Sequence, residues 1–292
     1  MVEVPADEIR RERLDCILFQ SKRNWTDDQY DILSDEQRRL PRIYLEHDPP
    51  RESPTDTHHH VDHPDVLVIH CTGFNDLMWD SGRSPTRVID HGVLPPEGVT
   101  YRGQLERGIV VVNGLAKRGR RLGADVFERV RQQLPLDLVG LESEQSGGLG
   151  PMTHADLPPF EARYRFFFNP IRYTSLGLSI IEAMMIGLPI VALATTEIPT
   201  VIENGRTGIA STSVDELIDG MRHLLRSPQE ARGLGEAGRA VARERFSIER
   251  FIGDWDRTFR DVVGRRGFTP GVELRERAAA AMAHAGGAGI AS

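Results

Sequence analysis

Short apolar runs separated by longer amphipathic segments set the organisation of this chain. Runs rich in β-branched and aromatic residues predict strands that are covered on both faces, as in a parallel sheet. The strands are expected at 14–20, 42–46, 65–71, 86–90, 108–113, 136–140, 166–168 and 190–194. Because helical segments alternate with these strands, the pattern indicates an α/β protein.

Predicted helices follow the last of these strands. Ser213 with Glu216, and Ser227 with Glu230, have the spacing of capping boxes, whose side chains satisfy free backbone N–H groups at a helix start. Apolar residues repeat at helical spacing after each box and again over 247–263. We therefore expect the chain to be helical up to residue 263.

The most informative stretch is 165–208. Its strand ends at Asn169-Pro170, because proline lacks a backbone donor and biases the preceding residue away from helix. A helix is predicted over 178–186, with Gly187 as its C-terminal stop, and another strand follows. Such a βαβ unit brings backbone N–H groups and the positive end of a helix to its loop, which suits an anionic ligand.

Glu182 lies about one turn into this predicted helix. A carboxylate so close to a phosphate site is explained if the ligand carries a hydroxyl-rich group beside its phosphate. The alternative is an ordinary βαβ unit in which Glu182 is a solvated helix residue.

The same stretch carries a series of motifs in a fixed order. They are Pro170, Leu176-Gly177-Leu178, Glu182-Ala183-Met184, Gly187, Pro189-Ile190-Val191, Ile198-Pro199, Val201-Ile202, Asn204-Gly205 and Gly208. In this order they resemble the nucleotide-sugar site of retaining glycosyltransferases of the GT-B fold, glycosyltransferase family 4 (glycosyl transferases group 1) in particular. The resemblance implies a GT-B-like fold, with two Rossmann-like domains built on parallel sheets.

The resemblance also implies roles for residues of this stretch. Glu182 is expected to bind the ribose of the donor, and the loop and helix start around it to hold the donor, namely Ser175, Leu176, Gly177 and Leu178. Thr174 stands where the family has the first glutamate of a Glu-x7-Glu pair, which lies toward the sugar and the phosphates. Thr174 is therefore a candidate catalytic position.

Four cations follow the strand at 108–113, namely Lys117, Arg118, Arg120 and Arg121. Cations at the carboxyl end of a strand, beside a helix start, converge on phosphate. The family has a glycine-arginine pair and a lysine at this turn, which bind the donor diphosphate, and here Gly114 stands where that arginine is expected. The alternative is a basic, solvated face.

Histidines raise two further questions. His47 follows a strand and resembles the histidine that many family members place near the reacting sugar. Its position suits this role, because ligands bind at the carboxyl ends of parallel strands. A loop histidine that caps the strand fits equally well. The run His58, His59, His60 and His63 contains a common metal-ligand type. Consecutive ligands point different ways and no zinc spacing appears, so a solvated, flexible loop is the preferred interpretation and no metal is expected.

The resemblance sets the expected domain organisation, with a hinge near 94–104. We expect a partial N-terminal Rossmann-like domain over 1–98, a nucleotide-sugar-binding Rossmann-like domain over 99–263 and a flexible, alanine- and glycine-rich tail over 264–292. The family's first domain opens with a strand and a glycine-rich loop, which nothing before Leu14 supplies, so the first domain is expected to be incomplete. A shortened family member and an N-terminally truncated gene sequence both fit.

The composition of the chain limits the kinds of protein to which it can belong. A chain of 292 residues with 39% hydrophobic and 27% charged residues is typical of a globular protein with about two domains. The net charge of −7 argues against general nucleic-acid binding. Cys16 and Cys71 lie in apolar runs, so buried thiols are expected. No run approaches the roughly 18 apolar residues of a membrane span and the first residues do not form a signal peptide, so we expect a cytoplasmic protein.

The expected activity is retaining transfer of a sugar from a nucleoside-diphosphate sugar to a saccharide or lipid-linked acceptor. The cationic loop and the helix start at Leu178 are expected to stabilise charge on the departing diphosphate. The partners are the donor and the acceptor; no cofactor and no nucleic acid are expected, and peripheral contact with the inner face of a membrane stays open. Two alternatives also stay open: a nucleotide-sugar epimerase of the same fold, and a non-catalytic nucleotide-sugar-binding module.

Overall fold

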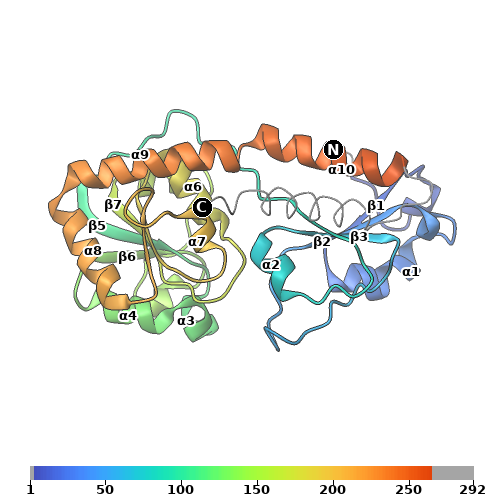
Figure 1. The fold of residues 1–292 in the computed structure, drawn as a ribbon, viewed down its shortest axis with the longest axis horizontal. Coiled ribbons are helices and arrows are strands. Elements are labelled where there is room, and N and C mark those ends of the chain that lie inside the picture. The colour runs from blue at the N-terminus through green and yellow to red at the C-terminus, as the bar shows by residue number, and fades with distance from the viewer. Residues whose placement is uncertain (1–2, 265–292) are drawn as a thin grey trace, which may run out of the picture. The chain divides into compact units, whose positions relative to one another are not determined.

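The computed structural model describes residues 3–264 (Figure 1). Contacts group the chain into two compact units, each with its own parallel sheet. Unit 1 contains the chain up to His70, the segment Asn75–Ile89 and the described residues from Trp255 onward, and unit 2 contains Cys71–Phe74 and Asp90–Asp254. The expected α/β class with two parallel sheets is confirmed. The expected limits of independently folding domains stay a prediction, and the predicted tail beyond Gly264 lies outside the described residues.

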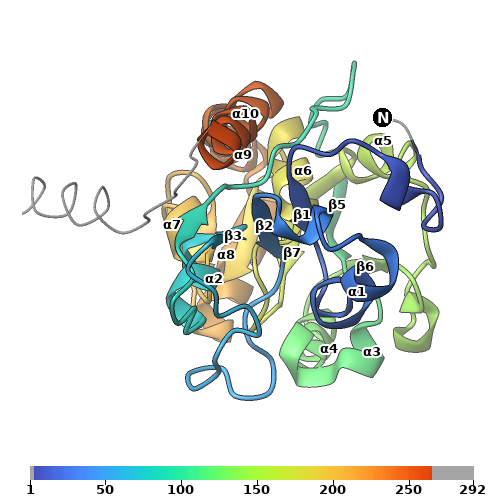
Figure 2. The same cartoon turned by 90° about the vertical axis from the view of Figure 1, so that its right-hand side faces the viewer.

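The sheet of unit 1 has four parallel strands in the order β1-β2-β3-β4 (Figure 2). These strands are β1 (Ile17–Phe19), β2 (Arg42–Glu46), β3 (Val66–His70) and β4 (Thr86–Val88). Its helical elements are short, namely η1 (Ile9–Arg11), η2 (Asn24–Asp28), α1 (Gln29–Ile32), η3 (Gln37–Arg39) and α2 (Gly73–Met78), whose first two residues group with unit 2. The end of α10 (Ile248–Gly264) packs here, because Arg87 donates to Thr258 at 2.8 Å and pairs with Asp261 at 2.9 Å.

The sheet of unit 2 has five parallel strands in the order β6-β5-β7-β8-β9. The strands are β5 (Leu105–Val111), β6 (Leu136–Val139), β7 (Tyr164–Asn169), β8 (Ile190–Leu193) and β9 (Ile209–Ser211). The helices are α3 (Leu115–Arg118), η4 (Gly119–Leu122), α4 (Ala124–Arg131), η5 (Ser143–Ser146), α5 (Leu157–Glu161), α6 (Leu178–Ile186), α7 (Ile198–Val201), α8 (Val214–Arg226) and α9 (Pro228–Arg245). Every predicted strand is present, whereas β9 was not predicted, because three residues are too few to show a periodicity.

Strand β7 is the core of unit 2. It lies between β5 and β8, and all of its residues are buried. Since neighbouring side chains of a strand point to opposite faces, Phe167 packs with Ile181 of α6, whereas Phe166 and Phe168 pack in a cluster with α4 and α8. The apolar run read from the sequence is therefore the central, doubly covered strand of this sheet.

The two predicted capping boxes have different outcomes. The Ser213 side chain accepts the N–H of Glu216 at 3.4 Å, so the serine half of the first box is confirmed, whereas the Glu216 carboxylate accepts from the hydroxyl of Ser211 and not from the Ser213 N–H. The second is wrong, because Ser227 makes no side-chain cap and Glu230 instead pairs with His223, which precedes it on α8. Glu230 of α9 thus pairs with a residue of the neighbouring helix α8 and not with the residue that starts its own helix.

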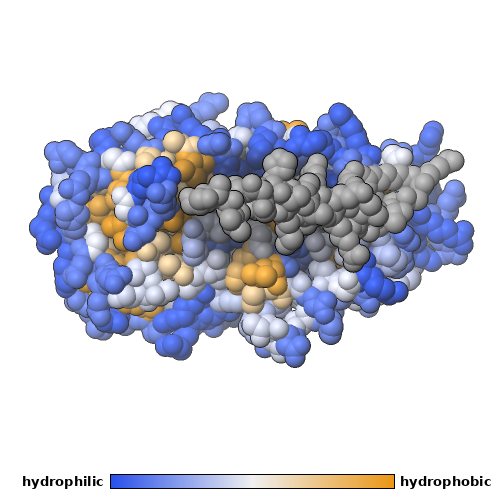
Figure 3. Space-filling model, viewed as in Figure 1, coloured by the Kyte–Doolittle hydropathy of each residue, from blue (hydrophilic) through white to orange (hydrophobic). Residues whose placement is uncertain are grey.

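The surface is largely hydrophilic on the face shown in Figure 3, with hydrophobic residues gathered in separate patches. Within the described residues, no helix is both long enough and apolar enough to cross a membrane.

Gly123 brings together the segments that follow β5 and β7. Its φ of 80° lies in the left-handed region, and a Cβ at this position would lie 1.9 Å from the carbonyl oxygen of Pro170. The N–H groups of Arg172 and Tyr173 also donate to the carbonyl of Arg121, at 3.0 and 3.2 Å. Glycine is therefore required for this close approach of the two segments.

We expect Gly123→Ala to lower the free energy of unfolding by more than about 2 kcal/mol. The methyl group has to occupy a left-handed backbone, which costs roughly 1–2 kcal/mol, and also has to displace the Pro170 carbonyl. Gly119→Ala is the matched control, since its φ of 57° is also left-handed but nothing lies within 4 Å of its Cβ. Urea unfolding measures both, and equal losses would show that the contact with Pro170 does not constrain these segments.

Candidate functional site

The candidate site in unit 2 begins with the loop between β7 and α6. Helix α6 starts at Leu178. The residue before it, Gly177, has an extended backbone with φ −67° and ψ 134°, and no side chain caps the start of the helix. The first N–H groups of a helix have no partner within the helix, so this positive end is not covered by a capping side chain. Such an end can bind an anion.

Ser175 adds a second sign of a ligand in this loop. The residue is buried, yet its hydroxyl has no hydrogen-bond partner within residues 3–264. Leaving a buried hydroxyl without a partner costs about 1–3 kcal/mol, and a bound ligand would remove that cost. Thr174 is partly buried beside it, while the side chain of Leu176 packs in the core next to α6.

Glu182 lies one turn into α6 with 21% of its side chain exposed. Burial raises the pKa of Glu182, and the nearby His154 lowers it. The two side chains approach to 3.9 Å between His154 Nδ1 and Glu182 Oε1, and His154 is otherwise exposed. Sequence reasoning missed His154, because it lies in an irregular segment before α5 with no motif around it.

The cationic segment lies on α3 and the turn η4, after β5. Arg120 forms an ion pair with Asp125, with 2.6 Å between Nη1 and Oδ2. Asp125 also accepts two hydrogen bonds from Arg172, and these hold its pKa below the usual value. Arg172, which sequence reasoning missed, thus connects the cationic segment to the loop after β7.

The other predicted cations differ in their surroundings. Lys117 and Arg118 are exposed on α3, whereas Arg121 is half-buried and its backbone carbonyl binds the loop that leads to Thr174. The structure therefore brings Arg121 to the loop between β7 and α6. Binding of phosphate by these four cations stays a prediction.

Glu197 is a buried carboxylate that the sequence did not single out. It is 2% exposed, accepts the N–H of Phe74 at 2.8 Å and pairs with Arg245 at 2.9 Å. Arg245 also pairs with Asp90 at 2.8 Å, so one arginine holds two acids. Thr196 has a φ of 52°, which is rare for a β-branched residue. This network joins the start of α7 to the end of α9.

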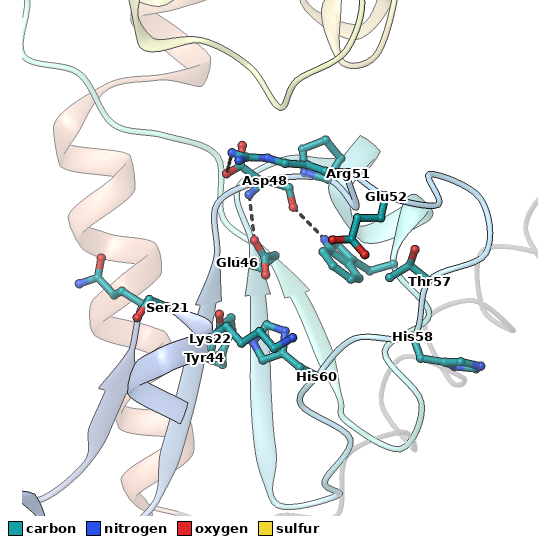
Figure 4. Close-up of a pocket in the computed structure, with 13 residues that line it drawn as sticks. Ser21, Lys22, Tyr44, Glu46, Asp48, Arg51, Glu52, Thr57, His58 and His60 are labelled. Carbon is teal, nitrogen blue, oxygen red and sulfur yellow. Dashed lines mark hydrogen bonds and ion pairs between the residues drawn. The ribbon is translucent and has the colours of Figure 1, made fainter. Parts of the chain in front are cut away.

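Unit 1 contains a separate cavity of about 500 Å³ at the ends of β1 and β2 (Figure 4). Aromatic and charged side chains line it together, including Tyr44, Glu46, Asp48, Arg51 and Trp79. Trp79 donates its indole N–H to the carbonyl of Asp48 at 2.8 Å, and Arg51 pairs with the Asp48 carboxylate at 2.5 Å. A flat apolar surface beside carboxylates suits a ligand with one apolar face and several hydroxyls.

Glu46 is held in place by the histidine run. His59 Nδ1 accepts the N–H of Val61 at 3.0 Å, so its Nε2 carries the proton, and it lies 3.2 Å from Glu46 Oε2. Burial opposes ionisation of Glu46, but the hydrogen bonds from His59 and from the Asp48 N–H outweigh it and lower the pKa of Glu46. Glu46 is therefore an ionised acceptor that lines the cavity.

The expectation of a solvated loop is wrong for His59, which is 4% exposed. Its backbone N–H donates to the carbonyl of Asp80 at 2.8 Å, and this contact turns the side chain inward. His60 lies against it, with ring centroids 4.3 Å apart and planes 25° apart, so consecutive histidines do not point to opposite sides here.

Glu46, His59 and His60 bring possible metal-ligand atoms within 4.8 Å of one another. A ligand nitrogen needs an unprotonated lone pair, and His59 uses its lone pair to accept the Val61 N–H. Two remaining groups are fewer than the three or four protein ligands of a zinc site. The arrangement fits a hydrogen-bonded pair better than a metal site.

His47 lies next to this cavity in sequence but not among the residues that line it. Side chains alternate along the end of β2, so Glu46 faces the cavity and His47 is exposed, with its carbonyl bound by Asn75 at 3.2 Å. A catalytic role for His47 stays a prediction, whereas Glu46 and Trp79 are pocket residues that sequence reasoning missed.

The structure thus has two parallel α/β sheets, one of which carries the uncapped start of α6 with a carboxylate one turn beyond it. This is the arrangement of the GT-B fold. Residues 107–227 match the protein family described as "Glycosyl transferases group 1". The expected family resemblance is thus confirmed for this domain and for the fold, while retention and a shortened first domain stay predictions.

Two curated relatives are mannosyltransferases. The chain is 40% identical over 209 residues to MMP alpha-(1->4)-mannosyltransferase of Mycolicibacterium hassiacum, which covers 63% of this chain and 51% of the relative. It is 36% identical over 98 residues to O-antigen chain mannosyltransferase B of Escherichia coli, which covers 30% of this chain and 25% of the relative. The chain thus spans about half of the first relative and about a quarter of the second.

Solved structures share the fold at low identity. Sucrose-phosphate synthase from Thermosynechococcus elongatus superposes with a TM-score of 0.66 at 18% identity, over 86% of this chain and 74% of that one. HepE of Anabaena in complex with UDP gives a TM-score of 0.60 at 18% identity, over 79% and 73%.

We expect Ser175→Ala to leave the free energy of unfolding of the ligand-free protein unchanged or higher, because it removes a hydroxyl without a partner. Ser143→Ala is the matched control: Ser143 is also buried, but its hydroxyl accepts the N–H of Gly150 at 2.9 Å, so its loss should cost about 1–3 kcal/mol. Urea unfolding compares the two. A similar loss in both variants would show that the Ser175 hydroxyl is bonded within the folded chain and not reserved for a ligand.

Proposed function

We propose that this protein is a retaining glycosyltransferase that moves a hexose from a nucleoside-diphosphate sugar, held by unit 2, to a saccharide or lipid-linked acceptor. The observation that carries the proposal is the uncapped start of α6, with the unpartnered Ser175 hydroxyl before it and Glu182 one turn beyond. Phosphate fits the helix start, and ribose hydroxyls fit the carboxylate. The group 1 domain and the names of the two mannosyltransferases support sugar transfer.

In this proposal the chain promotes departure of the nucleoside diphosphate. Negative charge grows on the diphosphate as its bond to the sugar breaks, and the α6 N–H groups, Ser175 and the nearby cations stabilise that charge. A metal ion is not needed for this role. Thr174 stands next to these groups and is proposed to contact the sugar, because its hydroxyl can both donate and accept a hydrogen bond.

We assign the acceptor to the cavity of unit 1. A pyranose has an apolar C–H face and hydroxyls around its edge, which match Trp79 and the Glu46 carboxylate. We further propose that the protein works in the cytoplasm, and at the inner face of the membrane if its acceptor is lipid-linked.

We expect Glu182→Ala to weaken binding of a nucleoside diphosphate by about 10- to 100-fold. Each ribose hydrogen bond to a charged acceptor is worth roughly 1.5–3 kcal/mol, and 1.4 kcal/mol is a factor of ten. Glu182→Gln keeps one acceptor oxygen and should fall between the alanine variant and wild type. Calorimetry with UDP, GDP and ADP measures the affinities.

A 2′,3′-dideoxy nucleotide is the control for this experiment. Without the hydroxyls it should bind wild type and Glu182→Ala with similar affinity. If the alanine variant loses the same factor for both nucleotides, Glu182 acts on folding and the donor site is misassigned. Absence of binding by the folded wild type at millimolar nucleotide would end the proposal.

We expect Trp79→Leu to raise the KM for the acceptor by about tenfold, a loss of about 1.4 kcal/mol, because the apolar platform is removed. The Kd of the nucleotide should not change. Leu77→Ala is the matched control, since Leu77 lies two residues before Trp79, near the end of α2, but is 79% exposed and does not line the cavity. An unchanged acceptor KM in an active Trp79→Leu enzyme would exclude this cavity as the acceptor site.

A further inference from the structure

Glu161, the last residue of α5, is a buried carboxyl group with no role in the mechanism above. It is 1% exposed, and its Oε2 has no hydrogen-bond partner in the described part of the chain. Its surroundings are apolar, because Leu157 and Phe160 of α5 pack in the same hydrophobic cluster as Ile180 and Ile181 of α6. An ionised carboxylate without partners is very costly in such a place, whereas a protonated one is much less so.

Helix α5 packs directly on α6, which carries Glu182. Burial raises the pKa of Glu161 well above its usual value, and the charge of Glu182 raises it further. The two carboxyl groups lie on helices that pack on each other, so ionisation of one disfavours ionisation of the other, and Glu182 is the more exposed of the two. Glu182 therefore takes the charge and Glu161 keeps the proton.

We propose that Glu161 is protonated in the working protein and thereby keeps Glu182 as the single negative charge at the nucleotide subsite. Ionisation of Glu161 adds a second negative charge, which repels the diphosphate and disturbs the carboxylate that binds the ribose. This rests on the proposed function. Glu161 touches no ligand in this account; it acts through Glu182.

Other titratable groups near α5 are already engaged. The segment before α5 contributes His154, which faces Glu182. Strand β7, the other element packed on α5, contributes Tyr164, whose hydroxyl donates to Asp137, and Arg165, whose guanidinium donates to the carbonyl of Gly103. Within the described residues, no hydrogen bond or ion pair joins a charged group of these elements to Glu161.

The proposal predicts that nucleotide binding is linked to a proton. If Glu161 begins to ionise as pH rises, a bound diphosphate favours its protonated form, so the ligand and a proton bind together. The Kd of wild type should rise at least about fivefold relative to that of the variant Glu161→Gln as pH rises from 6.5 through the range in which Glu161 ionises, which the stability measurement below locates. Glu161→Gln imitates the neutral acid, so it should keep the affinity that wild type shows at low pH.

The experiment is titration calorimetry with UDP, GDP and ADP over this pH range, in pairs of buffers that differ in ionisation heat. Wild type should take up protons on binding at the upper end of the range, and Glu161→Gln should take up fewer. Glu106→Gln is the matched control, because Glu106 is an exposed carboxylate of the same unit, and it should follow wild type. The comparison between proteins cancels the titration of the ligand itself.

Stability supplies a second measurement that needs no ligand. A carboxyl group whose folded pKa is raised stabilises the folded state fully below its unfolded pKa of 4.5, and this contribution is lost as pH rises toward the folded value. The free energy of unfolding of wild type, measured with urea, should therefore decline above pH 4.5 relative to that of Glu161→Gln. If that variant does not fold, Glu161→Met takes its place.

The outcomes separate the two proposals. Parallel pH profiles of Kd in wild type and Glu161→Gln, or a stability difference that does not change with pH, overturn the role of Glu161. Folded protein that binds none of the nucleotides at any pH overturns the proposed function and the role of Glu161 in it. Binding at pH 6.5 by both proteins, with loss at high pH in wild type alone, supports both proposals.

Discussion

The complete burial of β7 is the constraint on which the candidate donor site depends. A strand that is covered on both faces cannot move without disturbing two clusters, that of α6 on one side and that of α4 and α8 on the other. The loop from Pro170 to Gly177 leaves this strand at its carboxyl end, and α6 starts directly after it. The groups of the candidate site are therefore carried by a rigid element, as the proposed positioning of a diphosphate requires.

The site also separates its charges. The start of α6 is positive because it is a helix terminus, and the segment of Arg121 lies beside the loop before it, while the position one turn along α6 carries the carboxylate of Glu182. This polarity matches a nucleotide, whose diphosphate is anionic and whose ribose donates hydrogen bonds. A chain with a net charge of −7 can thus hold an anionic ligand, because the local arrangement and not the total charge decides binding.

Unit 1 shows how hydrogen bonds between distant segments order a polar cluster. The Asp80 carbonyl holds the backbone of His59, His59 donates to Glu46, and Trp79 reaches the carbonyl of Asp48. Each buried polar group in this chain of contacts has a partner from a different segment, and together they leave an ionised carboxylate beside an indole ring. These hydrogen bonds fix Glu46, Asp48 and Trp79 in the wall of the cavity.

The sequence by itself determined the α/β class, the order of the predicted strands, and the position of the loop and helix that carry Glu182, because periodicity, proline and glycine act over a few residues. Only the tertiary structure decided the rest. The inward turn of His59, the pairing of Glu230 with His223 and the burial of Glu161 all depend on segments distant in the chain or on another helix. Local patterns cannot report such contacts, since whether a polar side chain is solvated or buried is set by what folds against it.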